Sequence, residues 1–189
     1  MIKLPRLLVL ALLPLSLGAH AKVHETLDTG HYEARAQPGR SLAEAVNEAS
    51  PFRPGDRIFH SATAWTLDWQ VRPQSTADGR CRTEEVRIEL RGEMLLPRLK
   101  GGSRWQQDRF ESYLVRLREH ELGHFEIGRE AARHLEKQLY ALAPARSCTQ
   151  LQSAARAEGA RVLAKYEAMG DAYDMQTEHG RTQGAWLVD

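Results

Sequence analysis

The sequence predicts an α+β domain, in which a small antiparallel sheet is followed by a long helical hairpin, because its pattern changes once along the chain. From residue 31 to about residue 100, apolar and polar side chains alternate, as they do along strands with one buried face. After Gly101 the apolar period becomes about 3.6 and stays helical for most of the remaining chain. A length of 189 residues allows one domain with its own core.

The first 21 residues have the features of a secretory signal peptide. Lys3 and Arg6 form a basic start, residues 7–13 are an apolar core, and residues 19–21 place small side chains at alternate positions. We therefore expect cleavage before Lys22, which leaves residues 22–189 as a single domain in the periplasm or outside the cell. No later segment is apolar enough for a membrane helix, so we expect no integral membrane segment after signal cleavage.

The charges of the expected mature chain are nearly balanced. Of 26 basic side chains the leader holds Lys3 and Arg6, which leaves 24 against 25 acidic ones. Nucleic acids and anionic membranes are bound by a basic face, so neither is expected as a partner. No pattern in the sequence predicts an oligomeric state.

Short periodic segments place the elements of the sheet region. A short helix begins after Ser41, which forms a Ser-x-x-Glu capping box with Glu44. Residues 74–79 are rich in Ser, Thr, Asp and Gly and are predicted to be a hairpin loop between the second and third strands. The predicted strands, which share an alternating pattern, are residues 31–36, 64–71 and 86–91.

Two helices follow the sheet region. The first begins after Ser103, which is paired with Gln106 in a capping box, and it ends before Pro144. The second begins near Thr149, and Gly170 is its predicted terminator. Two helices joined by a short loop form an antiparallel hairpin. The inward stripe of the first helix is Phe110, Leu114, Leu117, Glu121, His124, Gly128, Ala131, Leu135 and Leu139.

Cys81 and Cys148 are the only cysteines. Export would place them in an oxidising compartment, where an even pair usually forms a bridge, so we predict a structural disulfide between them. The alternative, that they bind a metal, requires closely spaced ligand pairs, and these two cysteines stand far apart without His or Cys nearby.

The inward stripe of the long helix contains two polar residues, Glu121 and His124, among apolar or small ones. A buried carboxylate is costly unless it is paired or coordinated. His120 lies one turn before His124, so both imidazoles can reach one metal ion from the same side of the helix. Residues 120–124, HELGH, therefore carry the H-E-x-x-H pattern that predicts a Zn²⁺ site, with Glu121 as general base. The alternative is a chance match within a surface network of charges.

A catalytic zinc site needs a third protein ligand, which we expect from the C-terminal segment. The extended motif with a third histidine is absent, because Glu130 stands at that position. In the predicted hairpin, residues 167–171 lie opposite the HELGH motif, and a chain released by Gly170 has only a short way to the metal. His179 is the first choice as third ligand, followed by Asp174 and Glu178. The alternative role of His179 is that of a turn residue before Gly180.

These residues also suggest a family. The HELGH motif, Cys148 and a closing run together resemble the bacterial family of predicted secreted zinc-dependent proteases, which is catalogued as a domain of unknown function. The resemblance covers most of the expected mature chain, and it implies a secreted zinc-dependent protease. We expect a zincin-like fold, bound zinc and a peptide or protein substrate. The closing run consists of Tyr173-Asp174, Thr177, His179-Gly180 and Gln183-Gly184.

The expected function is hydrolysis of peptide bonds by a zinc metallopeptidase. Zinc polarises water and the scissile carbonyl, while Glu121 accepts a proton and passes it to the leaving amine. Tyr173 is predicted to donate a hydrogen bond to the developing oxyanion, with core packing as its alternative role. Asp174 would alternatively orient a ligand imidazole. Two other functions fit the motif: a zinc amidase acting on cell-wall or other amides, and a non-catalytic module that binds zinc for stability.

Overall fold

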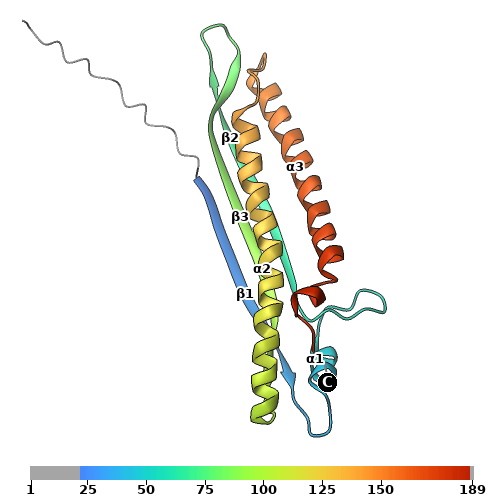
Figure 1. The fold of residues 1–189 in the computed structure, drawn as a ribbon. Coiled ribbons are helices and arrows are strands. Elements are labelled where there is room, and N and C mark those ends of the chain that lie inside the picture. Colours follow the sequence, from blue (N-terminus) through green and yellow to red (C-terminus); the bar gives the residue numbers. More distant parts are fainter. Residues whose placement is uncertain (1–21, 188–189) are drawn as a thin grey trace, which may run out of the picture.

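A computed structural model describes residues 22–187 and shows an elongated α+β domain, in which two long helices cover one face of a three-stranded sheet (Figure 1). The predicted fold class is therefore confirmed, whereas the predicted signal peptide lies outside the described residues. The strands are β1 (Lys22–Arg35), β2 (Ala62–Ser75) and β3 (Cys81–Lys100). The helices are α1 (Leu42–Ala49), α2 (Arg104–Tyr140) and α3 (Cys148–Thr177), followed by the 3₁₀ turn η1 (Arg181–Gln183).

The sheet is mixed, so the prediction of an antiparallel sheet is wrong for one of its two pairings. Strands β2 and β3 form the predicted antiparallel hairpin, and β1 pairs with β3 in parallel. The strand order is β1-β3-β2, because β3 inserts between β1 and β2 and runs in the same direction as β1. All three strands are longer than predicted. Alternating apolar and polar residues mark only the buried stretches of the strands. The pairing between strands continues beyond them into polar segments at the strand ends.

The helix starts follow the sequence closely, but one predicted helix end is wrong. Both capping boxes form, Ser41 with Glu44 and Ser103 with Gln106. Helix α3 does not stop at Gly170 and continues to Thr177. An interior glycine weakens a helix by about 1 kcal/mol without breaking its hydrogen bonds, so packing against α2 carries the helix past it. The helix ends where three successive residues adopt positive φ: Glu178 (49°), His179 (53°) and Gly180 (82°).

Two helix glycines let tryptophans of β2 approach the helices closely. A Cβ atom on Gly128 in α2 would lie 2.9 Å from the Trp65 ring. A Cβ atom on Gly159 in α3 would lie only 2.0 Å from the Trp69 ring. These contacts belong to a core cluster that the sheet forms with α3 and the C-terminal half of α2. A second cluster joins α1, parts of β1 and β3, the N-terminal half of α2 and residues 185–187.

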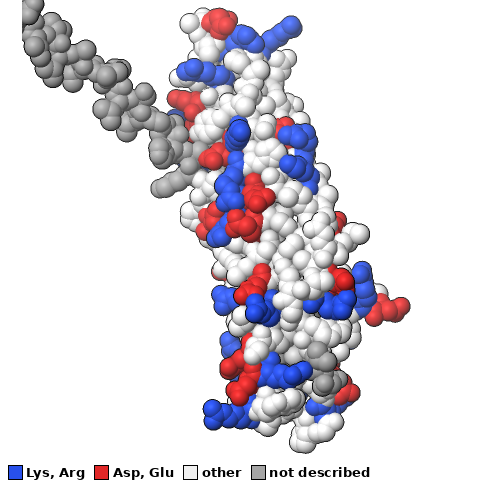
Figure 2. Space-filling model, viewed as in Figure 1, with Lys and Arg blue, Asp and Glu red and all other residues white. Residues whose placement is uncertain are grey.

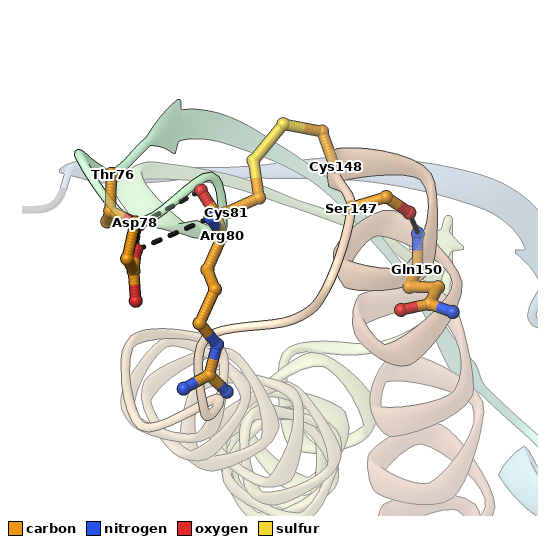
Figure 3. Close-up of a disulfide and its surroundings, with 7 residues drawn as sticks. All are labelled: Thr76, Asp78, Arg80, Cys81, Ser147, Cys148 and Gln150. Carbon is orange, nitrogen blue, oxygen red and sulfur yellow. Dashed lines mark hydrogen bonds between the residues drawn. A yellow bond between two sulfur atoms is a disulfide. The ribbon is translucent and has the colours of Figure 1, made fainter.

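The predicted disulfide between Cys81 and Cys148 is present (Figure 3). It joins the start of β3 to the start of α3, and the two Cα atoms are 5.1 Å apart. Cys81 and Ala145 also exchange two backbone hydrogen bonds, of 2.9 and 2.8 Å. The loop after α2 is thus fixed to the sheet beside the turn between β2 and β3. A structural disulfide fits a protein of an oxidising compartment.

Lys and Arg side chains are interspersed with Asp and Glu over the face drawn in Figure 2. The protein's exposed ion pairs include Arg91 with Asp68 at 3.1 Å and Arg129 with Glu25 at 2.8 Å. Such exposed pairs stabilise a fold by less than about 1 kcal/mol each. Within residues 22–187, no helix has both the length and the apolar character needed to cross a membrane.

Candidate metal centre

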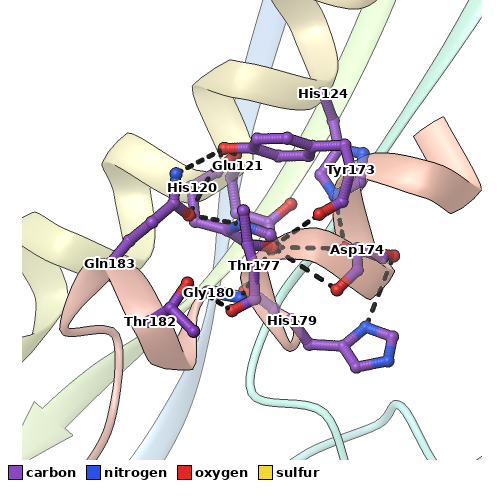
Figure 4. A network of polar contacts seen from close by, with 11 residues as sticks. His120, Glu121, His124, Tyr173, Asp174, Thr177, His179, Gly180, Thr182 and Gln183 are labelled. Carbon is purple, nitrogen blue, oxygen red and sulfur yellow. Dashed lines mark hydrogen bonds and ion pairs between the residues drawn. The ribbon is translucent and has the colours of Figure 1, made fainter. Parts of the chain in front are cut away.

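The middle of α2 and the last turns of α3 bring three potential metal ligands together (Figure 4). The ligand atoms of His120, His124 and Asp174 all lie within 4.8 Å of one another. Asp174 Oδ1 is 3.3 Å from His120 Nε2 and 3.0 Å from His124 Nε2. Two imidazole nitrogens and a carboxylate oxygen are donors that zinc accepts, and three protein ligands are typical of a catalytic zinc site.

The other candidate ligands lie outside this group. His179 Nδ1 is 3.4 Å from the second carboxylate oxygen of Asp174, and its ring packs against Phe59 with centroids 4.6 Å apart. The Glu178 carboxylate is exposed and paired with Arg181. The structure thus groups Asp174, and not His179, with the two histidines. This difference from the expected order of ligands follows from the length of α3. Because the helix continues past Gly170, which faces His124, Asp174 lies one turn further on and faces both histidines.

Glu121 is buried beside this group, with only 3% of its surface exposed. Its Oε1 accepts a hydrogen bond from the Ser61 hydroxyl, which lies just before β2. Its Oε2 is buried and has no hydrogen-bond partner among residues 22–187. A carboxylate oxygen in this state is costly, so it points to a ligand in the adjoining space. The donor set fits a metal ion such as zinc, and the unpartnered oxygen leaves room for a ligand beside it.

The site opens into a pocket of about 730 Å³. Its walls come from α1, the segment before β2, α2, the end of α3 and the C-terminal segment. The exposed rim includes the apolar side chains of Ile58 and Trp186, which are 37% and 59% exposed. A space of this size is typical of ligand sites and is wide enough for a short piece of peptide.

Hydrogen bonds with the two histidines favour the charged form of the Asp174 carboxyl. Burial alone would raise the pKa of the Asp174 carboxyl, but the hydrogen bonds from His120 and His124 outweigh it and hold this pKa well below its usual range. Burial alone would lower the pKa of His120, yet hydrogen bonds with Asp174 and Gln183 give it a raised pKa on balance. Asp174 is therefore held in contact with both histidines by hydrogen bonds.

Tyr173 packs against the HELGH motif from α3. Its ring stacks on the His120 ring, with centroids 5.1 Å apart and planes 13° apart, and meets the His124 ring edge-on. Its hydroxyl donates to the backbone carbonyl of His120 at 3.2 Å. Gly123 makes this approach possible, because a Cβ atom there would lie 2.2 Å from the Tyr173 hydroxyl. Tyr173 thus supports the helix that carries the ligands, and its predicted role toward an oxyanion stays a prediction.

Replacing Gly123 with alanine is expected to destabilise the protein, although alanine is the better helix former. The added Cβ would displace Tyr173 from His120, at a cost of about 1–3 kcal/mol. Gly170 is the matched control, because its Cβ would meet no atom closer than His124 Nδ1 at 3.9 Å. Gly170→Ala should stabilise α3 by about 0.5–1 kcal/mol. Urea unfolding measures both changes, and equal stabilisation by the two variants would contradict the tight packing of Tyr173.

His60 forms a second polar group in the pocket wall. Its Nδ1 is 2.6 Å from the Tyr113 hydroxyl, and its Nε2 is 2.7 Å from the side-chain oxygen of Asn47. Since the amide oxygen only accepts, Nε2 carries the proton and Nδ1 accepts from Tyr113, as in a neutral imidazole. Burial lowers the pKa of His60 to about 4.

We expect His60 to make the fold less stable in mild acid. In the unfolded chain it binds a proton near pH 6.5, but in the folded chain only near pH 4. Between these values the unfolded state holds more protons, so stability is lost as the pH falls. From pH 7 to 4.5 this loss amounts to about 2 kcal/mol. In urea unfolding with a chelator present, the wild type should lose that much more than His60→Gln, and equal losses would contradict the assignment.

Comparison with known proteins identifies the family of this chain but assigns it no activity. A family model described as a bacterial protein of unknown function (DUF922) matches residues 29–180. The matched range includes His120, Glu121, His124 and Asp174. No curated protein and no solved structure matches the chain.

Proposed function

We propose that this chain, which belongs to the DUF922 family of bacterial proteins of unknown function, is a zinc-dependent hydrolase that cleaves peptide bonds in the periplasm or outside the cell. One observation carries the proposal: the Glu121 carboxylate is buried at the pocket wall with one oxygen unpartnered among the described residues, beside the donors of His120, His124 and Asp174. A site that bound zinc only for stability would not need a general base held in this way.

His120, His124 and Asp174 are the residues that would hold the ion, with Asp174 in place of His179 as the third ligand. When bound, zinc supplies Lewis acidity, which makes water a stronger acid and polarises a carbonyl group. Three protein donors leave a fourth position open, as hydrolysis requires.

Glu121 moves the proton in this scheme. The Ser61 hydroxyl fixes one carboxylate oxygen, which directs the other oxygen, Oε2, to accept the proton of the attacking water. As the carbon–nitrogen bond breaks, the same oxygen returns the proton to the leaving amine. Water and an amide thus give a carboxylic acid and an amine, and Glu121 ends in its starting state. The apolar rim at Ile58 and Trp186 would exclude water around a bound peptide.

Metal content tests which residue is the third ligand. Asp174→Ala is expected to weaken zinc binding more than about 100-fold, because the loss of a direct ligand costs more than the loss of an outer contact. His179→Ala should leave zinc bound, because His179 contacts only Oδ2, the other carboxylate oxygen of Asp174. Zinc is measured by mass spectrometry after dialysis against a graded chelator, with circular dichroism as the check on folding. Loss of zinc in His179→Ala alone would make His179 the ligand.

A cleavage profile tests the reaction itself. Mature protein loaded with zinc is incubated with a denatured bacterial proteome and, separately, with purified cell-wall fragments. New peptide termini in the proteome sample that disappear with chelator are the expected result. Release of amines from the cell-wall fragments alone would make the protein an amidase. No cleavage of either substrate by the zinc-loaded protein would contradict the hydrolase.

A further inference from the structure

We propose that Gln183 is a positioning residue of the metal centre, which fixes the His120 ring so that Nε2 faces the other two donors. The inference rests on the proposed function only for the role of His120 as a zinc ligand. Gln183 lies in η1, beyond the matched residues 29–180, and its place in the closing run of the sequence assigns it no role. Its side-chain amide connects three segments: η1, α2 and α3 (Figure 4).

The hydrogen bonds form a closed chain. Gln183 Oε1 lies 2.9 Å from His120 Nδ1, and Gln183 Nε2 donates to the Tyr173 hydroxyl at 3.0 Å. The Tyr173 hydroxyl in turn donates to the His120 carbonyl at 3.2 Å. The amide oxygen can only accept, so His120 Nδ1 must carry the proton. With Nδ1 held by Gln183, Nε2, the atom 3.3 Å from Asp174 Oδ1, is the nitrogen of this ring that can give its lone pair to an ion once it has released its proton.

The backbone around Gln183 is fixed, so the amide is held where it can act. Gly180, with φ of 82°, packs on the His120 ring, and a Cβ atom there would lie 2.9 Å from its Cγ. The Thr182 hydroxyl donates to the Thr177 carbonyl at 3.1 Å, which ties η1 to the end of α3. Ala185 and Leu187 are each only 7% exposed and pack in the core cluster with α2. The segment after α3 thus forms the outer wall of the His120 ring.

A partner on the second nitrogen of a ligand histidine sets its tautomer and ring orientation, and loss of such a partner typically weakens metal binding 10- to 100-fold. Gln183 is exposed, so water can replace part of its hydrogen bond. We therefore expect an effect at the lower end, about tenfold. An amide provides this contact without adding a negative charge beside Asp174.

The test compares Gln183→Leu, which keeps the size of the side chain and removes the amide, with Gln183→Glu, which restores an acceptor. Gln176→Leu is the matched control, because Gln176 is exposed in the last turn of α3, five residues before η1 begins. Zinc affinity is measured by competition with a chromogenic chelator. The tautomer of His120 is measured in metal-free protein by nitrogen-15 NMR. The unfolding temperature of each variant separates a local from a global effect.

Gln183→Leu should bind zinc about tenfold more weakly and show a mixed His120 tautomer, whereas Gln183→Glu should keep the proton on His120 Nδ1 and Gln176→Leu should stay near the wild type. Unchanged affinity and tautomer in Gln183→Leu would overturn the proposal. If Gln183→Leu unfolds, the same two measurements on Gln183→Met decide the question. A wild type that binds no zinc would refute the proposed function alone, because the tautomer in metal-free protein still tests Gln183.

Discussion

Replacing Glu121 with glutamine is expected to lower peptide cleavage by a factor of about 10²–10⁴ while zinc stays bound. Glutamine has the same shape, and its oxygen can still accept the hydrogen bond from Ser61. Its nitrogen replaces the Oε2 atom, however, and an amide nitrogen cannot take a proton from water. The three donors of the metal centre are unchanged, so the effect should be confined to the rate of the reaction.

The measurement pairs zinc content with the cleavage profile of the mature protein. Glu119→Gln is the matched control, because Glu119 lies on the same helix with its side chain 55% exposed and paired with Arg116. This control should retain full activity. If Glu121→Gln kept both its zinc and its activity, the hydrolytic role of the site would be wrong. If it lost zinc as well, Glu121 would be acting on the metal donors and not as the base.

Removal of the disulfide is expected to lower the free energy of unfolding by about 4 kcal/mol. The bridge joins residues 67 positions apart, and a cross-link of this span removes much of the chain entropy of the unfolded state. A double Cys81→Ala, Cys148→Ala variant, compared with the wild type in urea unfolding, measures the effect. This loss is a large part of the stability of an ordinary domain, which is about 5–15 kcal/mol.

Reduction of the wild type with dithiothreitol provides the control, since it breaks the bond without changing the core volume. The reduced wild type and the double variant should unfold at similar urea concentrations. A loss below about 1 kcal/mol in both would contradict a structural role for the bridge and indicate that the two backbone hydrogen bonds between Cys81 and Ala145 hold the loop unaided.

Local signals in the sequence predicted the helix starts and the motif. The capping boxes at Ser41 and Ser103 act over three residues, so their outcome depends little on the rest of the fold. The same holds for His120 and His124, because one helical turn brings them together. The disulfide was predictable for another reason: the chain has only two cysteines, so only one intramolecular pairing exists.

The remaining errors concern contacts between distant segments. Whether α3 stops at Gly170 depends on its packing against α2, and a local propensity difference of about 1 kcal/mol does not decide that. The early helix end also led us to rank His179 before Asp174 as the expected third ligand, whereas the structure groups Asp174 with His120 and His124. The insertion of β3 between β1 and β2 likewise does not change the alternation of apolar and polar residues within each strand. The strand order could therefore not be predicted from that pattern. Ser61 was missed because its only signal is the contact with Glu121, 60 residues away.

Helix α3 is held at its two ends by different chemistry. Near the loop between α2 and α3, a covalent bond from Cys148 anchors the start of α3 to the sheet, and at the far end the donors of Asp174 meet those of α2. Oxidation of the thiols needs no ion, so the disulfide can form first. Asp174 then lies on a helix that is already tethered, which restricts the conformations in which it meets His120 and His124. If the site binds zinc as proposed, maturation of the domain would depend on two supplies, an oxidant for the disulfide and a divalent cation for the metal centre.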